Sequence, residues 1–334
     1  MKIILKEQGK KIPKIIGLDT IDIFKITLSR VKENIRRNIE DIEFIVFQDS
    51  FVPPDQNLVQ MITEYIDSKN KSINFDNVFY INRQGDQKYT FSSVPSTVFR
   101  ISDGDKFSKA IKILQDIKNK EISKKAFLYS PEETYVSLDS EIGQDTVLYP
   151  YTYIISSKIG KDVKIHQGNT ISNCEIEDGV EIFPYCYIEG AYIETDVKVG
   201  PFARMRPQVK VKKGARIGNF AEIKNSEIGE DTKVQHFSYI GDSVLGRNVN
   251  IGAGTVTCNF DGKNKNKTII GDNVFVGSGS MLIAPIKLDS YSYIGAGSSI
   301  NKNVPSYSLA VERADIKIIP EWVKRKKLFD EVKK

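Results

Sequence analysis

The sequence contains little cysteine or histidine. Its 334 residues include only Cys174, Cys186, Cys258, His166 and His236 of these two types. Three scattered cysteines are too few for a disulfide framework or a cysteine-rich zinc site, so we expect buried free thiols. A zinc site of the three-histidine kind needs more histidines than the chain has. We therefore expect no catalytic metal.

Long hydrophobic runs are also missing. No stretch approaches the roughly 18 uncharged apolar residues that a membrane span needs. The opening Met-Lys-Ile-Ile-Leu-Lys-Glu meets charge too early for a secretory signal. With 40% hydrophobic and 27% charged residues, the composition excludes a disordered or collagen-like chain. We expect a cytoplasmic globular protein with no membrane span.

The charge is only mildly unbalanced. A net charge of +5 arises from 48 basic and 43 acidic residues, which gives no indication of nucleic acid as a partner. Two lysine-rich clusters stand out, Lys263, Lys265 and Lys267 in a polar segment and residues 324–327 near the C-terminus. Each is either a solvated face or a contact for a phosphate-rich small ligand.

An internal repeat dominates the second half of the chain. From about residue 136 to 304, aliphatic residues recur six positions apart in nine triplets, and the first three triplets start 17 residues apart. The series runs from Ile142, Leu148 and Ile154 to Leu288, Ile294 and Ile300. An amphipathic helix repeats near 3.6 residues and a half-buried strand near 2, so neither structure fits.

The six-residue period predicts a triangular solenoid. In such a fold each hexad supplies a short strand and a corner, one aliphatic side chain points to the axis, and three hexads make a coil. Gly, Asn and Asp near many of these aliphatics suit the tight corners. The period breaks between Ile251 and Ile270, where we expect residues 257–267 to form a polar loop outside the coil. Loops on rigid scaffolds often carry ligand contacts.

The remainder of the chain lacks this period. Residues 107–119 place apolar side chains at helical spacing and predict an amphipathic connector helix packed on the first coil. The pattern before it predicts three strands and two helices, at residues 3–5, 43–47 and 78–81 and at 21–38 and 57–69, respectively. We expect four parts: a small α/β domain, a connector, the β-helix and a C-terminal tail, at residues 1–95, 96–130, 131–304 and 305–334, respectively. Val304-Pro305 ends the repeat in this reading, and the tail caps the solenoid or reaches a neighbour.

Three residues of the solenoid invite a chemical interpretation. His236 lies two positions after the inward Val234, on the coil surface, and a neutral imidazole there is able to accept a proton from an ammonium nucleophile. Arg206 and Lys224 lie about one coil earlier, where two cations on adjacent coils suit a sugar phosphate. From spacing alone, an ordinary surface histidine and a solvated salt-bridging face remain alternatives.

Longer motifs in the solenoid resemble the acetyltransferase half of the bifunctional GlmU family, which makes UDP-N-acetylglucosamine. They are Gly-Pro-Phe-Ala-Arg-Met-Arg-Pro at 200–207, Gly-Asn-Phe at 218–220, His-Phe-Ser-Tyr-Ile-Gly-Asp at 236–242, Asn-Val-Asn-Ile-Gly-Ala-Gly-Thr-Val-Thr at 248–257, Cys-Asn-Phe-Asp-Gly at 258–262 and Lys-Thr-Ile-Ile-Gly-Asp at 267–272. The resemblance covers residues 200–313 closely and the connector at 131–135 more weakly.

The resemblance implies a left-handed parallel β-helix, a homotrimer with active sites between subunits, and acetyl transfer from acetyl-CoA to the amine of glucosamine 1-phosphate. His236 falls on the family's general base. Arg206 and Lys224 fall on the family's phosphate-binding cations, Tyr239 and Asn250 on its sugar contacts, and Lys265 on a further sugar-site residue. The positions of the acetyl-CoA contacts are Ala253, Asn259, Phe260, Ser278, Ala296 and Arg313.

The sequence departs from the family at two places. Phe260 stands where the family commonly has Tyr, so one hydroxyl is missing beside the acetyl-CoA position. The family's uridyltransferase half opens with a Gly-rich Leu-Ala-Ala-Gly-x-Gly-Thr-Arg-Met signature, whereas residues 4–10 here offer a single glycine, so no backbone cradle for nucleotide phosphates is apparent. We therefore predict that uridyl transfer is absent. Residues 1–95 then serve stability or trimer contacts, or dock a separate uridyltransferase.

Other readings remain open at this stage. The runner-up is a hexapeptide acyltransferase for another phosphorylated or nucleotide-linked amino sugar. A non-catalytic solenoid scaffold is the rival outside enzymes, because a fold alone does not fix a function. The basic run at residues 324–327 either binds the phosphates of CoA or solvates the tail.

Overall fold

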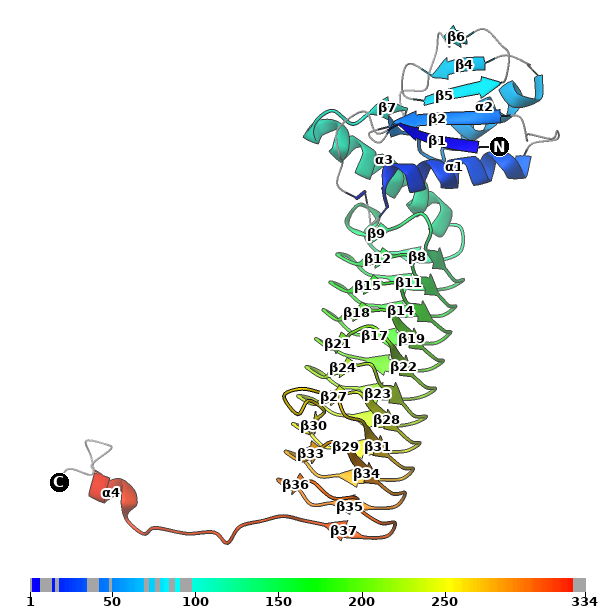
Figure 1. Ribbon diagram of the computed structural model, residues 1–334. Helices are drawn as coiled ribbons and strands as arrows, with labels where there is room; N and C mark the ends of the chain where they lie inside the picture. Colours follow the sequence, from blue (N-terminus) through cyan, green and yellow to red (C-terminus); the bar gives the residue numbers. More distant parts are fainter. Residues whose placement is uncertain are drawn as a thin grey trace.

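The computed structural model describes residues 2–6, 14–15, 18–34, 42–47, 50–68, 72–75, 79–83, 88–90 and 98–326. A small α/β part sits at one end of a tall column of stacked coils, and the C-terminal tail leaves the column at its other end (Figure 1).

The α/β part is built on a five-stranded sheet with the order β1-β2-β5-β4-β6. Its strands are β1 (Lys2–Lys6), β2 (Ile42–Phe47), β4 (Ser72–Phe75), β5 (Phe79–Arg83) and β6 (Lys88–Thr90). Two helices, α1 (Thr20–Asn34) and α2 (Gln56–Ser68), accompany it, and β3 (Ser50–Phe51) pairs with β7 (Phe99–Arg100).

The three predicted strands are confirmed as β1, β2 and β5, although Val78 lies outside the described residues. The two predicted helices are α1 and α2, and residues 35–38 and 69 of those predictions are likewise outside the described part. The short strands β3, β4, β6 and β7 carry no period long enough to reveal them.

The connector helix is α3 (Gly104–Ile122), longer at both ends than predicted. Asp103 caps its first turn by accepting the amide of Lys106 at 2.9 Å. Ala110 and Leu114 are buried against the α/β part. On the other side, the Gln115 side chain donates to the carbonyls of Pro131, Glu132 and Thr134, which ties the helix to the chain entering the first coil.

The solenoid has three faces, each a sheet of parallel strands, and we number the faces 1 to 3. Face 1 contains β10 (Glu141–Ile142), β13 (Lys158–Ile159), β16 (Glu175–Ile176), β19 (Ala191–Ile193), β22 (Val209–Val211), β25 (Glu227–Ile228), β28 (Ser243–Leu245), β31 (Thr268–Ile270) and β34 (Ile286–Leu288).

Face 2 contains β8 (Phe127–Leu128), β11 (Val147–Leu148), β14 (Lys164–Ile165), β17 (Glu181–Ile182), β20 (Lys198–Val199), β23 (Arg216–Ile217), β26 (Lys233–Val234), β29 (Asn250–Ile251), β32 (Phe275–Val276), β35 (Tyr293–Ile294) and β37 (Leu309–Ala310). Face 3 contains β9 (Tyr135–Val136), β12 (Tyr153–Ile155), β15 (Thr170–Ser172), β18 (Tyr187–Glu189), β21 (Arg204–Met205), β24 (Glu222–Lys224), β27 (Tyr239–Gly241), β30 (Val256–Cys258), β33 (Met281–Ile283) and β36 (Ser299–Ile300). The 2/3 corner joins face 2 to face 3, and the 3/1 corner joins face 3 to face 1 of the next coil.

The inward positions confirm the predicted repeat. Every aliphatic residue of the nine triplets is buried in one continuous core. Each such side chain contributes roughly 1.5–3 kcal/mol when fully removed from water. The seventh triplet lacks a third aliphatic residue, and the fully buried Thr257 takes that position. The parallel β-helix preceded by a small α/β part and a connector helix, the fold class expected from the sequence, is therefore confirmed.

The break in the period is smaller than predicted. Thr257 and Cys258 belong to strand β30, so the segment that leaves the coil begins at Asn259 and not at residue 257. At the far end the coils continue past Val304-Pro305, because β37 still pairs with β35, Leu309 opposite Tyr293. Paired solenoid strands thus extend from residue 127 to residue 310.

The described part of the tail beyond the last coil is extended and exposed, and it ends in α4 (Trp322–Lys326) (Figure 1). Ile316 and Ile318 are 89% and 81% exposed. Lys327, the last residue of the basic run, lies outside the described part.

The three cysteines are free thiols, as predicted. Cys174 and Cys186 are buried, and burial raises the pKa of each thiol to about 11. Cys258 is only partly buried, so the expectation of full burial fails there. None of the described helices combines the length and the apolar composition that a membrane crossing requires.

Candidate active site

His236 lies at the 2/3 corner, directly after β26. The inward Val234 and the buried Ser238 anchor the chain on either side of it, and the Ser238 hydroxyl donates to the carbonyl of Gly252 at 3.2 Å. Between these anchors His236 is exposed, and its ring meets the ring of Phe237 edge to face at 5.8 Å. The predicted catalytic residue therefore projects from a rigid corner.

A ladder of backbone hydrogen bonds continues from His236 down the corner. Gly254 donates to the carbonyl of His236 at 3.2 Å, Gly279 to Ala253 at 2.7 Å, and Gly297 to Ser278 at 2.8 Å. The donors Gly254, Gly279 and Gly297 directly follow Ala253, Ser278 and Ala296 in the chain. These three predicted acetyl-CoA contacts are therefore stacked in one column below His236.

The three glycines of this column leave its surface bare. They have φ values of 71°, 70° and 73°. A Cβ built on Gly254 or Gly279 would meet nothing closer than 3.9 or 4.0 Å, and one on Gly297 would meet nothing within 4 Å. The column below His236 is therefore an open strip of backbone and small side chains, which suits a long, thin ligand. We call it the glycine column.

Aromatic residues occupy the same corner in the preceding coils. Tyr185, Phe202, Phe220 and Phe237 also have positive φ, and successive ring centroids are 5.2–5.3 Å apart. Such φ values are rare for bulky residues, and the corner geometry imposes them. This aromatic ladder ends at Phe237, in the coil of His236, and the glycine column begins in the next coil.

Arg313 lies at the lower end of the glycine column. A Cβ on Gly295 would come within 3.6 Å of an Arg313 guanidinium nitrogen, so the side chain lies over the residue that precedes Ala296. The structure thus brings four of the six predicted acetyl-CoA contacts into one column with His236.

Three predicted substrate-binding cations, Arg206, Lys224 and Lys265, gather at face 3, and we call them the cation cluster. Arg206 directly follows β21, Lys224 ends β24, and Lys265 reaches them from the segment that leaves the coil. The nearby Lys265 ammonium, desolvation and the positive charge of Arg206 lower the pKa of the Lys224 ammonium. Cations this close repel one another unless an anion joins them, so the cluster favours a phosphate.

Two carboxylates accompany these cations. Glu222 accepts from Arg206 Nη1 at 3.3 Å. Asp242, at the 3/1 corner, accepts from Asn225 Nδ2 at 2.6 Å and from the amide of the Asn259 side chain. Burial acts to raise the pKa of Asp242, but these amides and the charges of Lys224 and Lys265 lower it overall. An ionised Asp242 therefore holds Asn259 at the base of the protruding segment.

The protruding segment, residues 259–267, is a fixed turn. The Asp261 carboxylate accepts the backbone amides of Lys263 and Asn264 at 2.8 and 2.6 Å and the side-chain amide of Asn266 at 2.9 Å. These bonds lower the pKa of Asp261 to about 2. Phe260 and Lys265 form a β-bridge across the turn, so it presents an exposed aromatic ring and a cation together.

Tyr239 joins the cation cluster, whereas Asn250 does not. A Cβ on Gly241 would lie 2.5 Å from the Tyr239 hydroxyl, so this side chain lies along face 3 over Gly241. Gly241 pairs with Lys224, which brings the hydroxyl toward the cations. Asn250 lies on face 2, between Lys233 and Phe275.

The predicted acetyl-CoA contacts are divided within one chain. The glycine column precedes β30, and Asn259 and Phe260 follow it, so the two groups flank opposite edges of face 3. Sequence reasoning missed Glu222, Asn225, Asp242 and the column glycines. The signal available in the sequence was the 17-residue step, one coil, from Asn225 to Asp242. In the structure both residues occupy corners, with φ of 44° and 51°.

Comparison with known proteins finds relatives of this part of the chain. The model of the GMPPB C-terminal domain matches residues 187–290, which contain His236 and the cation cluster. The bifunctional protein GlmU of Thermodesulfovibrio yellowstonii is 49% identical over 200 residues, 60% of this chain and 44% of that protein. GlmU of Thermotoga maritima is 48% identical over 201 residues, 60% of this chain and 45% of that protein. Over its solenoid, this chain is a homologue of GlmU.

The alignments span less than half the length of these GlmU relatives. Among solved structures, an Arabidopsis UDP-N-acetylglucosamine acyltransferase is similar at 16% identity and a TM-score of 0.42, over 60% of this chain and 77% of that chain.

Proposed function

We propose that this protein transfers the acetyl group of acetyl-CoA to the amine of glucosamine 1-phosphate. The product, N-acetylglucosamine 1-phosphate, is a precursor of UDP-N-acetylglucosamine and hence of peptidoglycan and lipopolysaccharide, and we place the reaction in the cytoplasm. The observation that carries the proposal is the position of His236, above the glycine column and in the same coil as Tyr239 of the cation cluster.

The cation cluster is the proposed site of the acceptor's phosphate. Arg206, Lys224 and Lys265 supply charge-assisted donors, and the Tyr239 hydroxyl adds a neutral one. The Glu222 carboxylate orients the Arg206 guanidinium. Because Asn250 lies on face 2, its proposed sugar contact is made from the other side of the 2/3 corner.

The glycine column is the proposed track for acetyl-CoA. A thin chain lying over Gly254 and Gly279 would bring the thioester up to His236, and Arg313 at the lower end suits a phosphate of the same ligand. Ala253, Ser278 and Ala296 are small enough to leave the track open. This arrangement holds the two reactants near one another, which is a large part of catalysis in transfer between two bound substrates.

The proposed chemistry requires one proton acceptor and no covalent enzyme intermediate. Neutral His236 removes a proton as the acceptor nitrogen bonds to the thioester carbon. A backbone amide or an asparagine side chain donates to the oxyanion that forms. The carbon–sulfur bond then breaks, and the thiolate of CoA leaves with the proton that His236 returns.

A homotrimer with sites between subunits is part of the proposal. Asn259 and Phe260 lie across face 3 from the glycine column, so a neighbouring copy would be needed to complete the acetyl-CoA contacts. The aromatic ladder supports such packing, because Tyr185, Phe202, Phe220 and Phe237 are 53%, 47%, 49% and 62% exposed in one chain. A continuous exposed apolar surface commonly marks an interface.

We also propose that uridyl transfer is absent and that residues 1–95 serve stability or trimer contacts. The sequence at residues 4–10 supplies one glycine where a phosphate cradle needs several. Docking of a separate uridyltransferase by this part is the alternative role.

The test is thiol release from acetyl-CoA by the purified protein with three acceptors, glucosamine 1-phosphate, glucosamine 6-phosphate and a UDP-linked amino sugar. We expect turnover with glucosamine 1-phosphate alone, and no pyrophosphate release from UTP with the product sugar phosphate. Turnover confined to another acceptor would move the substrate to the runner-up class. Absence of turnover with all three would favour a non-catalytic scaffold, and UTP turnover would disprove the loss of uridyl transfer.

A further inference from the structure

A separate cavity lies at the junction of the α/β part and the connector helix. It is bounded by α1, the start of α2 and α3, and has a volume of about 480 Å³. Arg30, Lys120 and Lys124 line it, together with Asp55, Gln56 and Glu121. None of these residues belongs to the acetyl-transfer site, and we call this space the junction cavity.

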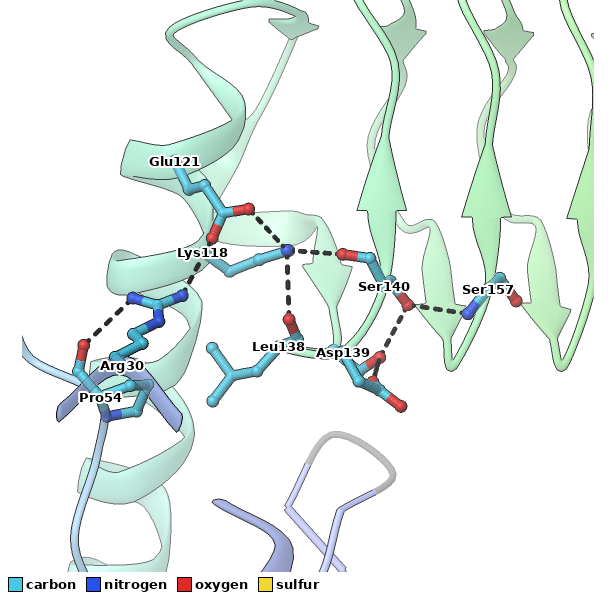
Figure 2. Close-up of polar contacts among 9 residues, drawn as sticks. Arg30, Pro54, Lys118, Glu121, Leu138, Asp139, Ser140 and Ser157 are labelled. Atoms are coloured by element: carbon cyan, nitrogen blue, oxygen red, sulfur yellow. Dashed lines mark hydrogen bonds and ion pairs between the residues drawn. The ribbon is translucent and has the colours of Figure 1, made fainter. Parts of the chain in front are cut away.

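One carboxylate in the cavity wall is shared by two cations. Glu121 Oε2 lies 3.3 Å from Arg30 Nη2, and Glu121 Oε1 lies 3.0 Å from Lys118 Nζ (Figure 2). Arg30 also donates to the carbonyl of Pro54 at 3.2 Å, which fixes its guanidinium at the cavity. The single negative charge of Glu121 is therefore divided between two positive charges.

Lys118 is buried behind this wall. Its residue is 2% exposed, and its ammonium also donates to the carbonyls of Ser140 at 2.6 Å and Leu138 at 3.3 Å (Figure 2). Desolvation lowers its pKa, Glu121 acts against that, and the positive charges of Arg30 and Lys125 lower it further. The neighbourhood of Glu121 thus carries more positive than negative charge.

The remaining charges of the wall add to this surplus. Lys120 and Lys124 lie one turn apart on α3 and are exposed. Asp55 is the other carboxylate, and one of its oxygens accepts the amide of Leu58 at 3.2 Å as the cap of α2. Gln56 begins α2 at the cavity, where the positive end of the helix dipole adds to the field of the lysines. Among the described lining residues, three cations, Arg30, Lys120 and Lys124, face two carboxylates that already have partners.

We propose that the junction cavity binds the phosphate group of a small metabolite, with Arg30, Lys120 and Lys124 as its charged contacts. Its volume lies within the range of small-molecule sites, about 300–1,000 Å³. Arg30 supplies a planar donor held in place by Pro54 and Glu121, and the two lysines supply mobile charge above it. A bound phosphate would touch α1, α2 and α3 at once, and α3 is bonded through Lys118 to the first coil.

The test is isothermal titration of the full chain with pyrophosphate, with inorganic phosphate and ATP as further arms. The probing variant is Lys120→Gln/Lys124→Gln, the matched control is Lys112→Gln on an exposed part of α3, and Lys224→Gln/Lys265→Gln removes cations of the acetyl-transfer site. Hydrogen exchange with and without pyrophosphate locates the bound anion. Binding of inorganic phosphate alone would identify the free ion as the ligand, and stronger binding of ATP would identify a phosphorylated metabolite.

We expect pyrophosphate to protect amides at residues 55–60 and 117–124, and Lys120→Gln/Lys124→Gln to weaken that binding at least tenfold. The Lys112→Gln and Lys224→Gln/Lys265→Gln variants should keep it. Binding that disappears only in Lys224→Gln/Lys265→Gln, an equal loss in Lys112→Gln, or no protection at these residues would each overturn the proposal. The outcome does not depend on acetyl transfer, so it is separable from the fate of the proposed function.

Discussion

The backbone amide of Gly254 donates to the carbonyl oxygen of His236 at 3.2 Å. This bond stacks the histidine corner directly on the first glycine of the bare column below it. Phe237 and Gly254 occupy equivalent places in successive coils, with φ values of 59° and 71°. The same backbone shape thus carries an aromatic ring in one coil and no side chain in the next.

Replacing Gly254 with phenylalanine should extend the aromatic ladder by one ring and cover the track of acetyl-CoA. The fold should survive, because this corner already accepts four aromatic residues at positive φ. We expect the KM for acetyl-CoA to rise at least tenfold, measured by thiol release at saturating acceptor.

The matched control is Asp145→Phe, which places the same side chain at an exposed corner with φ 59° in the first coil. It should leave the KM unchanged. A KM for acetyl-CoA within twofold of wild type in Gly254→Phe would mean that the ligand does not lie on the glycine column.

Removing cations at face 3 should weaken the binding of the acceptor and leave the binding of acetyl-CoA unchanged. A charge-assisted hydrogen bond to a phosphate is roughly twice as strong as a neutral one. Lys224→Gln and Lys265→Gln should therefore each raise the KM for glucosamine 1-phosphate by roughly tenfold or more. Steady-state kinetics with each substrate varied in turn separates the two effects, and an equal rise in both KM values would argue against a phosphate site here.

The pH dependence of kcat/KM for the acceptor should reflect the protonation of Lys224. Its pKa is lowered chiefly by the neighbouring Lys265, so Lys224 loses its proton at a lower pH than an ordinary lysine. Acceptor binding that relies on this charge should weaken as the pH rises through that pKa. The Lys265→Gln variant lacks the main cause of the lowered pKa of Lys224, so the alkaline fall in kcat/KM for the acceptor should move to higher pH. A fall that stays in place would exclude Lys224 as its source.

The aromatic ladder should be needed for assembly. Phe202→Ser and Phe220→Ser remove rings from the middle of the exposed row, where they contact ladder neighbours at 5.2–5.3 Å. We expect these variants to sediment as smaller species than wild type and to lose acetyl transfer together with the trimer. Tyr307→Ser, which removes an 81% exposed ring from a different corner, is the control. A trimer that persists in both variants would place the interface elsewhere.

The fold was largely readable from the sequence, because each inward position tolerates only an apolar residue of limited size. Ile142 and Ile300, at the two ends of the series, are both buried as the period requires. The end of the solenoid was harder to predict, since Leu309 pairs through its backbone on face 2 while its side chain is 65% exposed. The inward residue of this strand is the small Ala310, which packs on the core only partly buried, so the hydrophobic pattern gives little sign of the pairing.

The connection between α3 and the first coil could not be predicted from the sequence, because it depends on a buried lysine. Lys118 looks like a solvent-facing residue of an amphipathic helix, yet it is buried with its ammonium bonded to Leu138 and Ser140 (Figure 2). Those partners lie about 20 residues further along the chain and are backbone carbonyls, which any residue type supplies. No sequence pattern marks such partners.

Lys118→Met should destabilise the junction. The substitution keeps an unbranched side chain but leaves two carbonyls without the donor that now satisfies them, at a cost of about 1–3 kcal/mol. Relief of the desolvation that lowers the pKa of Lys118 acts in the opposite direction, so we expect a net loss at the lower end of this range. Chemical denaturation at neutral pH measures it, with exposed Lys112→Met as the control. Unchanged stability would show that the buried ammonium contributes nothing net.

The candidate site was only partly predictable, even with long motifs. The structure brings most of the predicted residues close to His236 or Lys224, but their division across face 3 depends on which corner each one occupies. The motif at 258–262 is continuous with the one at 248–257 in sequence, yet the three residues of β30 separate them in space. Only the coil geometry shows that Ala253 and Asn259 lie on opposite edges.

The most direct test of the account is the rate of thiol release from acetyl-CoA with glucosamine 1-phosphate, compared between wild type and His236→Ala. A general base contributes about 10² to 10⁴ in rate, so kcat should fall by that factor while the KM for acetyl-CoA stays close to wild type. Turnover of His236→Ala within tenfold of wild type would contradict the role of His236 and the mechanism built on it.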